Sequence, residues 1–300
     1  MTLPVQRIST VLAAAATYDL TDLSTVRDEL GLKVTDTSNN AWLARAITQV
    51  SRAIERHCKR RFAPEWLQDI IQFGRDPFPG ARFAGDNEIA LARWPLLAVL
   101  SVTQSLPNGI VRTLAAGVDF IVDMSTGCLL RLGRDGRIER WEAIPLTVQY
   151  IAGFGDLVIE TLPVPAVAPY QVTVSQAASW SVAQSVAYAS GEMLKPVGAD
   201  PAQGQYSVAA GVYTFNVADE GQGLTFSYAT FKVPDDLVDV VLQLITGRVA
   251  AKGRDPALIQ RERPGIGVER FWFGGTPGQD GQFPPDVAAA LDEYRVPTVA

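Results

Sequence analysis

The amino-acid composition changes at both ends of residues 160–230, and this change constrains the possible folds more than any other feature. The segment holds five acids against one lysine and no arginine, a net charge of −4, whereas the whole chain carries −6. A Pro-rich run opens it at 162–169, and alternating apolar and polar residues follow, as at 170–174 and 224–228. Short alternating runs separated by glycine are typical of β-sandwich strands. The sequence therefore predicts an all-β, sandwich-like domain at 159–230, inserted into another fold.

Amphipathic helices are predicted on both sides of this segment. The strongest follows Asn40, and its apolar side chains recur at three- and four-residue spacing: Leu43, Ile47, Val50, Ile54 and Cys58. A shorter helix at 19–31 precedes it. Two more follow the segment, one at 233–247 that begins with proline and two acids, and one at 285–295.

Residues 65–154 have the pattern of a small antiparallel sheet. Strand-like runs at 67–73, 97–103 and 146–151 are separated by turn signals, of which Asn108 followed by Gly109 is the strongest. The predicted fold class is therefore α+β: a small helical core with a short antiparallel β-sheet, plus an inserted all-β sandwich-like domain. The expected domains are an N-terminal arm at 1–18, the first part of the core at 19–158, the inserted domain at 159–230, the second part of the core at 231–262, and a C-terminal arm and helix at 263–300.

Few residues can carry catalytic or metal-binding chemistry. His57 is the only histidine, and Cys58 and Cys128 lie 70 positions apart, which fits neither a zinc site nor a disulfide framework. Helix neighbours point about 100° apart, so His57 and Cys58 cannot form a dyad, and Cys58 continues the apolar stripe. The Gly-x-Gly pairs at 153–155 and 265–267 lack the third glycine of a dinucleotide turn. We expect no enzyme activity, no metal, no cofactor and no membrane span.

Two features suggest contacts with other molecules. Residues 45–61 carry six basic side chains against the single acid Glu55. A solvated helix face, a subunit interface facing acids of the next copy, and a nucleic-acid site all fit this run. The aromatic residues Phe271, Trp272 and Phe273 lie in a Gly- and Pro-rich stretch, where three large rings are typical of an interface anchor.

Five segments along the chain carry a family resemblance. They are DLTDLSTVRDELGL at 19–32, IERHCKRRF at 54–62, VQYIAGFG at 148–155, VPDDL at 233–237 and LDEYR at 291–295. In this order they resemble the head–tail connector, or adaptor, proteins of long-tailed bacteriophages, over about residues 19–155 and 231–300. The segment 160–230 departs from that family and looks like the β-modules that recur in phage virion proteins.

The resemblance implies a non-enzymatic virion protein of the neck, between capsid and tail, assembled in the host cytoplasm. Connectors of this family form a homo-oligomeric ring, commonly dodecameric, that docks to the portal protein and presents a platform for the stopper or tail-completion protein. Double-stranded DNA passes through the lumen without sequence-specific binding, which suits a protein with a pI near 5.0. The candidate residues of the portal or subunit interface are Arg52, Arg56, Arg60, Phe271, Trp272, Phe273, Phe283, Leu291, Tyr294 and Arg295.

Alternatives stay open at this stage. We expect residues 271–295 to dock on the portal and to be partly mobile in the free subunit; the alternative is that the last helix packs back on its own domain. A second function compatible with the sequence is a tail or capsid decoration protein whose β domain binds carbohydrate or capsid. A third is a hydrolase with a dispersed carboxylate pair.

Overall fold

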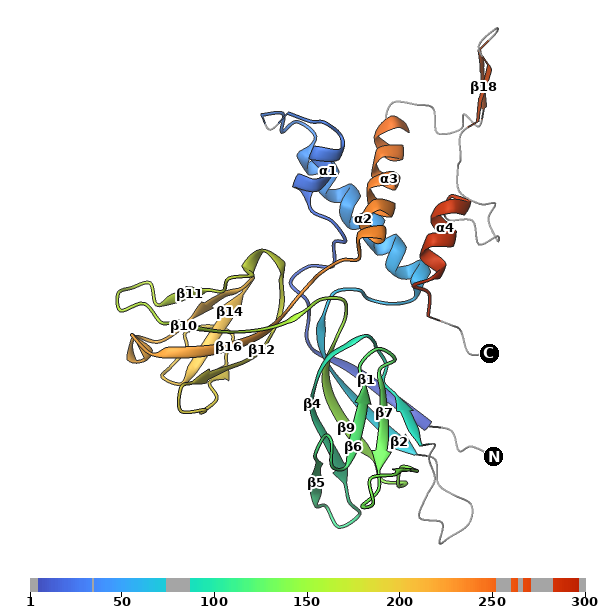
Figure 1. Ribbon diagram of the computed structural model, residues 1–300. Helices are drawn as coiled ribbons and strands as arrows, with labels where there is room; N and C mark the ends of the chain where they lie inside the picture. The colour runs from blue at the N-terminus through green and yellow to red at the C-terminus, as the bar shows by residue number, and fades with distance from the viewer. Residues whose placement is uncertain are drawn as a thin grey trace. The chain divides into compact units, whose positions relative to one another are not determined.

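The chain forms two compact units, each built from two separate stretches of sequence (Figure 1). The β unit comprises Met1–Thr17 and Ala63–Lys232, and the helical unit comprises Tyr18–Phe62 and Val233–Ala300. The computed structural model describes residues 5–33, 35–73, 87–251, 260–263, 267–270 and 283–296. No helix in these ranges is long and apolar enough to cross a membrane.

The described residues contain four α-helices and several sheets in which nearly all strand pairs are antiparallel. This is a mixed fold with more β-structure than the small helical core and short sheet that the sequence predicts. The excess includes short hairpin strands, such as Phe120–Asp123 with Cys128–Leu132, and the strand Val5–Ala13, whose partner is Glu65–Phe73.

The helical unit confirms the predicted helices. It contains α1 (Leu23–Glu29), α2 (Asn40–Cys58), α3 (Asp235–Ala251), α4 (Pro285–Asp292) and the paired strands β17 (Gln260–Arg263) and β18 (Gly267–Arg270). Helix α1 begins at Asp22, whose Oδ1 accepts a hydrogen bond from the Thr25 N–H at 2.9 Å. Helix α2 contacts each of the other three helices.

The apolar stripe of α2 forms the centre of this unit's core. All five of its predicted members, from Leu43 to Cys58, are at most 3% exposed. Residues of α3 and α4 are buried with them, among them Leu237, Val241, Ile245, Val287 and Leu291. Burying one aliphatic side chain stabilises a fold by about 1.5–3 kcal/mol. The shared core therefore holds α3 and α4 to α2, although about 180 and 230 residues of chain, respectively, separate them from it.

The β unit begins with two sheets around one core. The first has the order β1 (Val5–Ala13), β2 (Glu65–Phe73), β9 (Leu146–Ala152), β4 (Leu96–Ser105) and β5 (Val111–Leu114). The second has the order β3 (Glu88–Ala90), β7 (Cys128–Leu132) and β6 (Phe120–Asp123), with β8 (Ile138–Glu139) pairing with β7. Buried Trp141, Tyr150 and Leu67 belong to their common core. The predicted strands and the turn at Gly109, whose φ is +79°, are confirmed.

Within the predicted N-terminal arm, residues 5–13 form a strand. Strand β1 pairs antiparallel with β2 from Val5 opposite Phe73 to Ala13 opposite Trp66. Every side chain from 6 to 12 is exposed, including Ile8 at 59%. The sequence of β1 alternates poorly because neither of its faces is buried, so periodicity could not reveal it.

Residues 157–230, which we call the β module, contain two further sheets. One has the order β10 (Leu157–Pro163), β16 (Gly223–Thr230) and β12 (Trp180–Tyr188); the other has the order β11 (Gln171–Thr173), β15 (Val212–Thr214), β14 (Gln205–Ala209) and β13 (Lys195–Pro196). Short 3₁₀ turns, η1 (Ala177–Ser179) and η2 (Val217–Asp219), connect them. An aromatic core includes Tyr213 and Phe226, whose rings lie 4.9 Å apart. That this module folds independently stays a prediction.

The two ends of the β module meet beside the first sheet. The Thr230 N–H donates to the Asp156 carbonyl at 2.9 Å. Ser181 Oγ donates to the Pro64 carbonyl at 2.8 Å, and Val182 packs with Ile151 of β9 in a small buried cluster. The module is therefore connected to the rest of the β unit by two adjacent chain crossings, by the hydrogen bond from Ser181 to Pro64 and by the apolar contact of Val182 with Ile151.

Candidate interaction sites

Three arginines form a line on the exposed face of α2. Arg45, Arg52 and Arg56 are separated by seven and four residues, so their side chains share one helix face. They span about 16 Å along the axis, given a rise of 1.5 Å per residue. Within the described ranges none of the three forms an ion pair. We call these three residues the arginine stripe.

The C-terminal end of the basic run is used inside the helical unit. Arg60 is half-buried, its Nη1 donates to the Tyr294 carbonyl at 3.4 Å, and its guanidinium lies 5.7 Å from the Phe62 ring centre. Burial lowers the pKa of Arg60. Arg61 pairs with the buried carboxylate of Glu55. Of the three predicted interface arginines at 52–60, Arg52 and Arg56 therefore face solvent, whereas Arg60 contacts its own unit.

Acidic side chains gather on the other two long helices of the same unit. Six exposed carboxylates lie at the start of α3 and along α4: Asp235, Asp236, Asp239, Asp286, Asp292 and Glu293. Some have local partners: both oxygens of Asp236 accept from the Tyr294 hydroxyl at 2.7–2.8 Å, and Asp286 accepts from Gln243 at 2.9 Å. One unit thus exposes a positive stripe and a negative surface on different helices.

The predicted C-terminal interface residues lie against α2 and α3. Phe283 is 6% exposed with its ring 5.3 Å from that of His57, and Leu291 is fully buried. Tyr294 packs its ring 5.9 Å from that of Phe62, and Arg295 lies 3.7 Å from Asp292. For residues 283–296 the structure follows the alternative in which the last helix packs on its own domain. Phe271, Trp272 and Phe273 lie outside the described residues.

Neither cysteine is arranged as a nucleophile. The Cys58 thiol is buried, its Sγ lies 3.6 Å from the Leu291 carbonyl, and burial raises its pKa to about 12. His57 instead lies 3.4 Å from Asp292. Burial also raises the pKa of Cys128. Among the described residues, no group of three His, Cys, Asp or Glu side chains could hold a metal ion.

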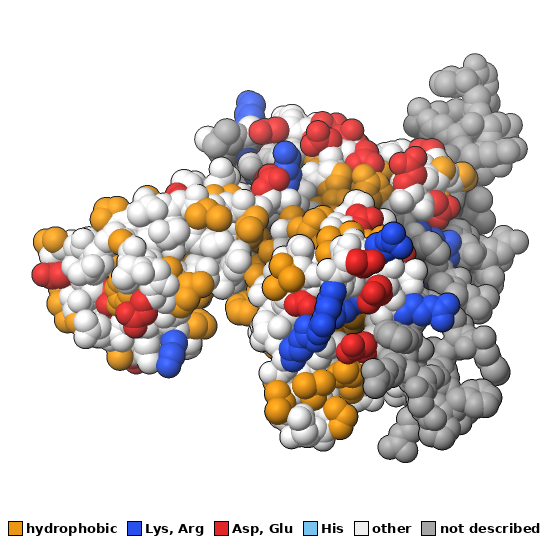
Figure 2. All heavy atoms as spheres, turned by 60° about the horizontal axis from the view of Figure 1, so that its bottom comes forward, with side chains coloured by type: hydrophobic (Ala, Val, Ile, Leu, Met, Phe, Trp, Pro, Cys, Tyr) orange, Lys and Arg blue, Asp and Glu red, His pale blue; other side chains and the backbone are white. Residues whose placement is uncertain are grey.

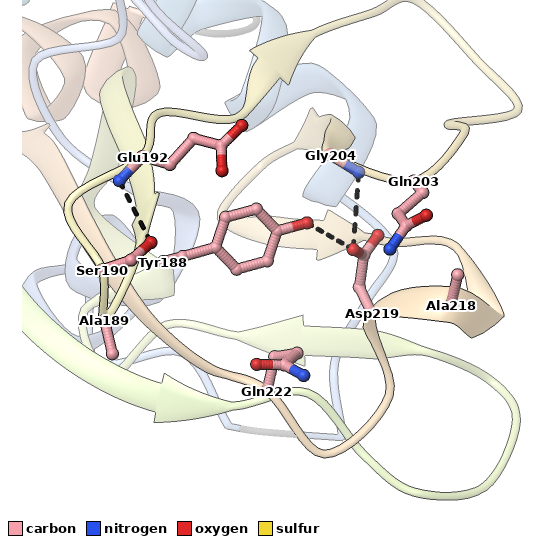
Figure 3. Close-up of a pocket in the computed structure, with 9 residues that line it drawn as sticks. All are labelled: Tyr188, Ala189, Ser190, Glu192, Gln203, Gly204, Ala218, Asp219 and Gln222. Carbon is pink, nitrogen blue, oxygen red and sulfur yellow. Dashed lines mark hydrogen bonds between the residues drawn. The ribbon is translucent and has the colours of Figure 1, made fainter.

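A polar pocket in the β module escaped the sequence analysis (Figure 3). Its volume is about 490 Å³, and its lining comes from three stretches: the end of β12 with the following turn, the residues before β14, and η2 with the turn after it. Tyr188, Glu192, Gln203, Asp219 and Gln222 supply its long side chains. No local sequence pattern marks such a site, because the contributing segments are each about 15 residues apart.

The buried carboxylate of Asp219 forms the floor of this pocket. Asp219 is 1% exposed, and its Oδ1 accepts from the Tyr188 hydroxyl and from the Gly204 N–H at 3.4 Å. Burial and the contact with Asp219 raise the pKa of Tyr188 to about 12, so the phenol remains a donor. Asn216 caps η2 by accepting from the Ala218 N–H at 3.0 Å, which fixes the turn that carries Asp219.

No protein-family model matches this chain, and no curated protein matches it. Among solved structures, a chain from "Neck of empty GTA particle computed with C6 symmetry" is 13% identical, with 98% of this chain and 97% of that chain covered and a TM-score of 0.42. A chain from "Virion of native gene transfer agent (GTA) particle" is 12% identical, with coverage of 98% and 97% and a TM-score of 0.38. A chain from "Neck of native GTA particle computed with C12 symmetry" is 14% identical, with coverage of 99% and 98% and a TM-score of 0.35. At these TM-scores the likeness does not establish a common fold, and no family is assigned from it.

Proposed function

We propose that this chain is a non-enzymatic structural protein of a phage-like virion, a head-to-tail connector in the neck. In this role it forms a homo-oligomeric ring on the portal, extends the channel through which double-stranded DNA passes, and supports the stopper or tail-completion protein. The proposal starts from the sequence resemblance over residues 19–155 and 231–300.

One structural observation carries the proposal. The resembling segments on the two sides of residues 160–230 fold together: α1 and α2 from the first, and α3 and α4 from the second, share one buried core. A helical unit built from two stretches of chain is expected of a connector core that the β module interrupts.

The charges of the helical unit support ring formation. A closed ring needs a heterologous interface, in which two different patches of the chain meet. The arginine stripe on α2 and the carboxylates on α3 and α4 are such a pair of patches, and opposite potentials fix register and favour encounter. Of the three interpretations of the basic run, the proposal selects the subunit interface. The overall pI near 5.0 disfavours binding of nucleic acid by this chain.

The decisive test is an electron-microscopy reconstruction of the protein together with its portal ring. The expected result is one ring of this chain, about a dozen copies, attached to the portal. Quantitative mass spectrometry of purified particles gives an independent count. Hundreds of copies spread over the capsid, or turnover abolished by a single substitution, would exclude the connector role.

A further inference from the structure

The pocket of the β module is lined by residues between 188 and 222, none of which is used in the proposed connector role. Buried Asp219 forms its floor and Tyr188 its aromatic wall. The exposed polar rim consists of Ser190, Glu192, Gln203 and Gln222. The volume of the pocket, about 490 Å³, is within the usual range for small-molecule sites.

The Asp219 carboxylate at the floor of the pocket lacks one hydrogen-bond partner. Asp219 Oδ1 has two donors, but Oδ2 is buried and has no hydrogen-bond partner among the described residues. Figure 3 shows the Gln203 side chain beside this carboxylate, without a hydrogen bond between them. Buried carboxylate oxygens in native structures are almost always satisfied, and an exception points to a partner that is not yet present. Because this oxygen is buried, the Gln203 amide beside it can supply that donor once a ligand orders the Gln203 side chain.

The rim can both donate and accept hydrogen bonds. Gln203 and Gln222 each offer an amide NH₂ and an amide oxygen, Ser190 offers a hydroxyl, and Glu192 offers carboxylate oxygens. All four are exposed. The ring of Tyr188 lies between Glu192 and Gln222 (Figure 3), and its half-buried face offers an apolar surface beside these polar groups.

The charge of the pocket excludes anionic ligands. Its lining contains two carboxylates, Asp219 and Glu192, and no lysine, arginine or histidine. The surrounding module has few charges on the face that Figure 2 shows at the left. A phosphate or a carboxylate would meet repulsion and no cation. A divalent cation of the calcium type needs six to eight oxygen ligands, and no group of three acidic, cysteine or histidine side chains is present in the described part of the chain.

We propose that this pocket binds a neutral saccharide. Adjacent sugar hydroxyls donate to Glu192 and accept from the amide of Gln222, and a hydroxyl that accepts from Gln203 orders this side chain against Asp219. The C–H face of the sugar ring lies on Tyr188. A simple amine would use the carboxylates but leave the amide donors without partners. A ligand with both donors and acceptors on neighbouring carbons uses all of them, and polyhydroxylated rings have this property.

The test uses the full chain and saturation-transfer-difference NMR with a panel of neutral monosaccharides and disaccharides of glucose, galactose, mannose and N-acetylglucosamine. At least one member should bind at about millimolar affinity or better. The double substitution Glu192→Gln and Gln222→Ala should weaken that binding about tenfold, because each removes one or more hydrogen bonds at an exposed position.

Two matched variants make the result specific. Glu220→Gln changes an exposed carboxylate next to Asp219 in sequence but outside the pocket lining, and Gln171→Ala changes an exposed amide on β11; both should bind as the unchanged protein does. No binding of any panel member would overturn the proposal. Binding that the pocket variants leave unchanged, or binding of calcium or a diamine in place of sugars, would also overturn it.

Discussion

The backbone at Gly153 approaches another segment so closely that no side chain fits. Its φ is +148°, a value that L-residues rarely adopt, and a Cβ there would lie 2.5 Å from Pro64 N and Cα. The Gly-x-Gly pair at 153–155 therefore has a packing role, at the point where the chain leaves β9 for the β module. The same pair lacks the third glycine of a dinucleotide turn.

We expect Gly153→Ala to lower the free energy of unfolding by about 2–4 kcal/mol, because it adds a steric clash to an unfavourable φ. The matched control is Gly221→Ala, where φ is +69° but nothing lies within 4 Å of an added Cβ. The control should lower the free energy of unfolding by about 1 kcal/mol, the cost of the unfavourable backbone conformation alone. Urea denaturation measures both, and equal losses would show that the contact with Pro64 is unimportant.

The carboxylate of Asp123 stabilises the turn between β6 and β7. Its Oδ1 accepts from the Ser125 hydroxyl at 2.6 Å, the Ser125 N–H at 3.0 Å and the Thr126 N–H at 3.3 Å. These hydrogen bonds, first of all that from the Ser125 side chain, lower the pKa of Asp123 from 3.8 to about 2. Because the folded-state pKa lies below the unfolded one, the stabilisation is present above about pH 4 and is lost as the pH falls toward 2.

Substituting Asp123→Asn should therefore lower Tm at pH 7 but have little effect at pH 2. Differential scanning calorimetry of both proteins at the two pH values measures this difference. A Tm gap that stays constant with pH would mean that the charge of Asp123 does not contribute to the turn.

At the scale of elements, α4 belongs to the core of the helical unit. Leu291 is fully buried and the Val296 N–H donates to the Cys58 carbonyl at 3.0 Å. Leu291→Ala should lower the free energy of unfolding of the isolated protein by about 2–5 kcal/mol, the cost of a large-to-small change in a core. Glu293→Ala, an exposed neighbour, is the control and should have little effect. An unchanged stability of the Leu291 variant would indicate that α4 is a docking arm.

Whether an element can be predicted from the sequence depends on where the segments that stabilise it lie along the chain. The helices are predictable because their own side chains repeat every three to four residues, as Leu43 and Ile47 do on α2. Strand β1 is not, because its stability comes from pairing with β2 some 60 residues away. The amphipathic face of α4 was recognised, but an apolar face has the same pattern whether it covers its own core or a partner. The pocket around Asp219 depends on three turns meeting in space.

At the scale of the whole molecule, the β module is the clearest candidate for an independent part. Asp156, just before the module, accepts a hydrogen bond from Thr230, its last residue, so joining residue 156 to residue 231 spans a short gap. A chain without 157–230 should keep a cooperative melting transition and its helical circular dichroism. It should melt at a lower temperature, because Ile151 loses its contact with Val182 and Ala229. Loss of the cooperative transition would show that the module is an inseparable part of the β unit.

The last prediction concerns assembly through the arginine stripe. Reversing Arg52→Glu and Arg56→Glu should weaken occupancy of portal rings at least about tenfold, because two attractive contacts with the next copy become repulsive. The control is the pair Arg134→Glu and Arg140→Glu, which makes the same change in net charge at two exposed sites on the β unit.

Adding Asp235→Arg and Asp239→Arg to the stripe variant restores opposite charges and should restore the ring. These two carboxylates are chosen because Asp236 accepts a hydrogen bond from Tyr294. Mass photometry of portal rings mixed with each variant measures their occupancy. Added salt should lower the occupancy that the unchanged protein reaches in the same assay. If the reversal acts but the compensating changes do not rescue it, the stripe faces a partner other than a second copy of this chain.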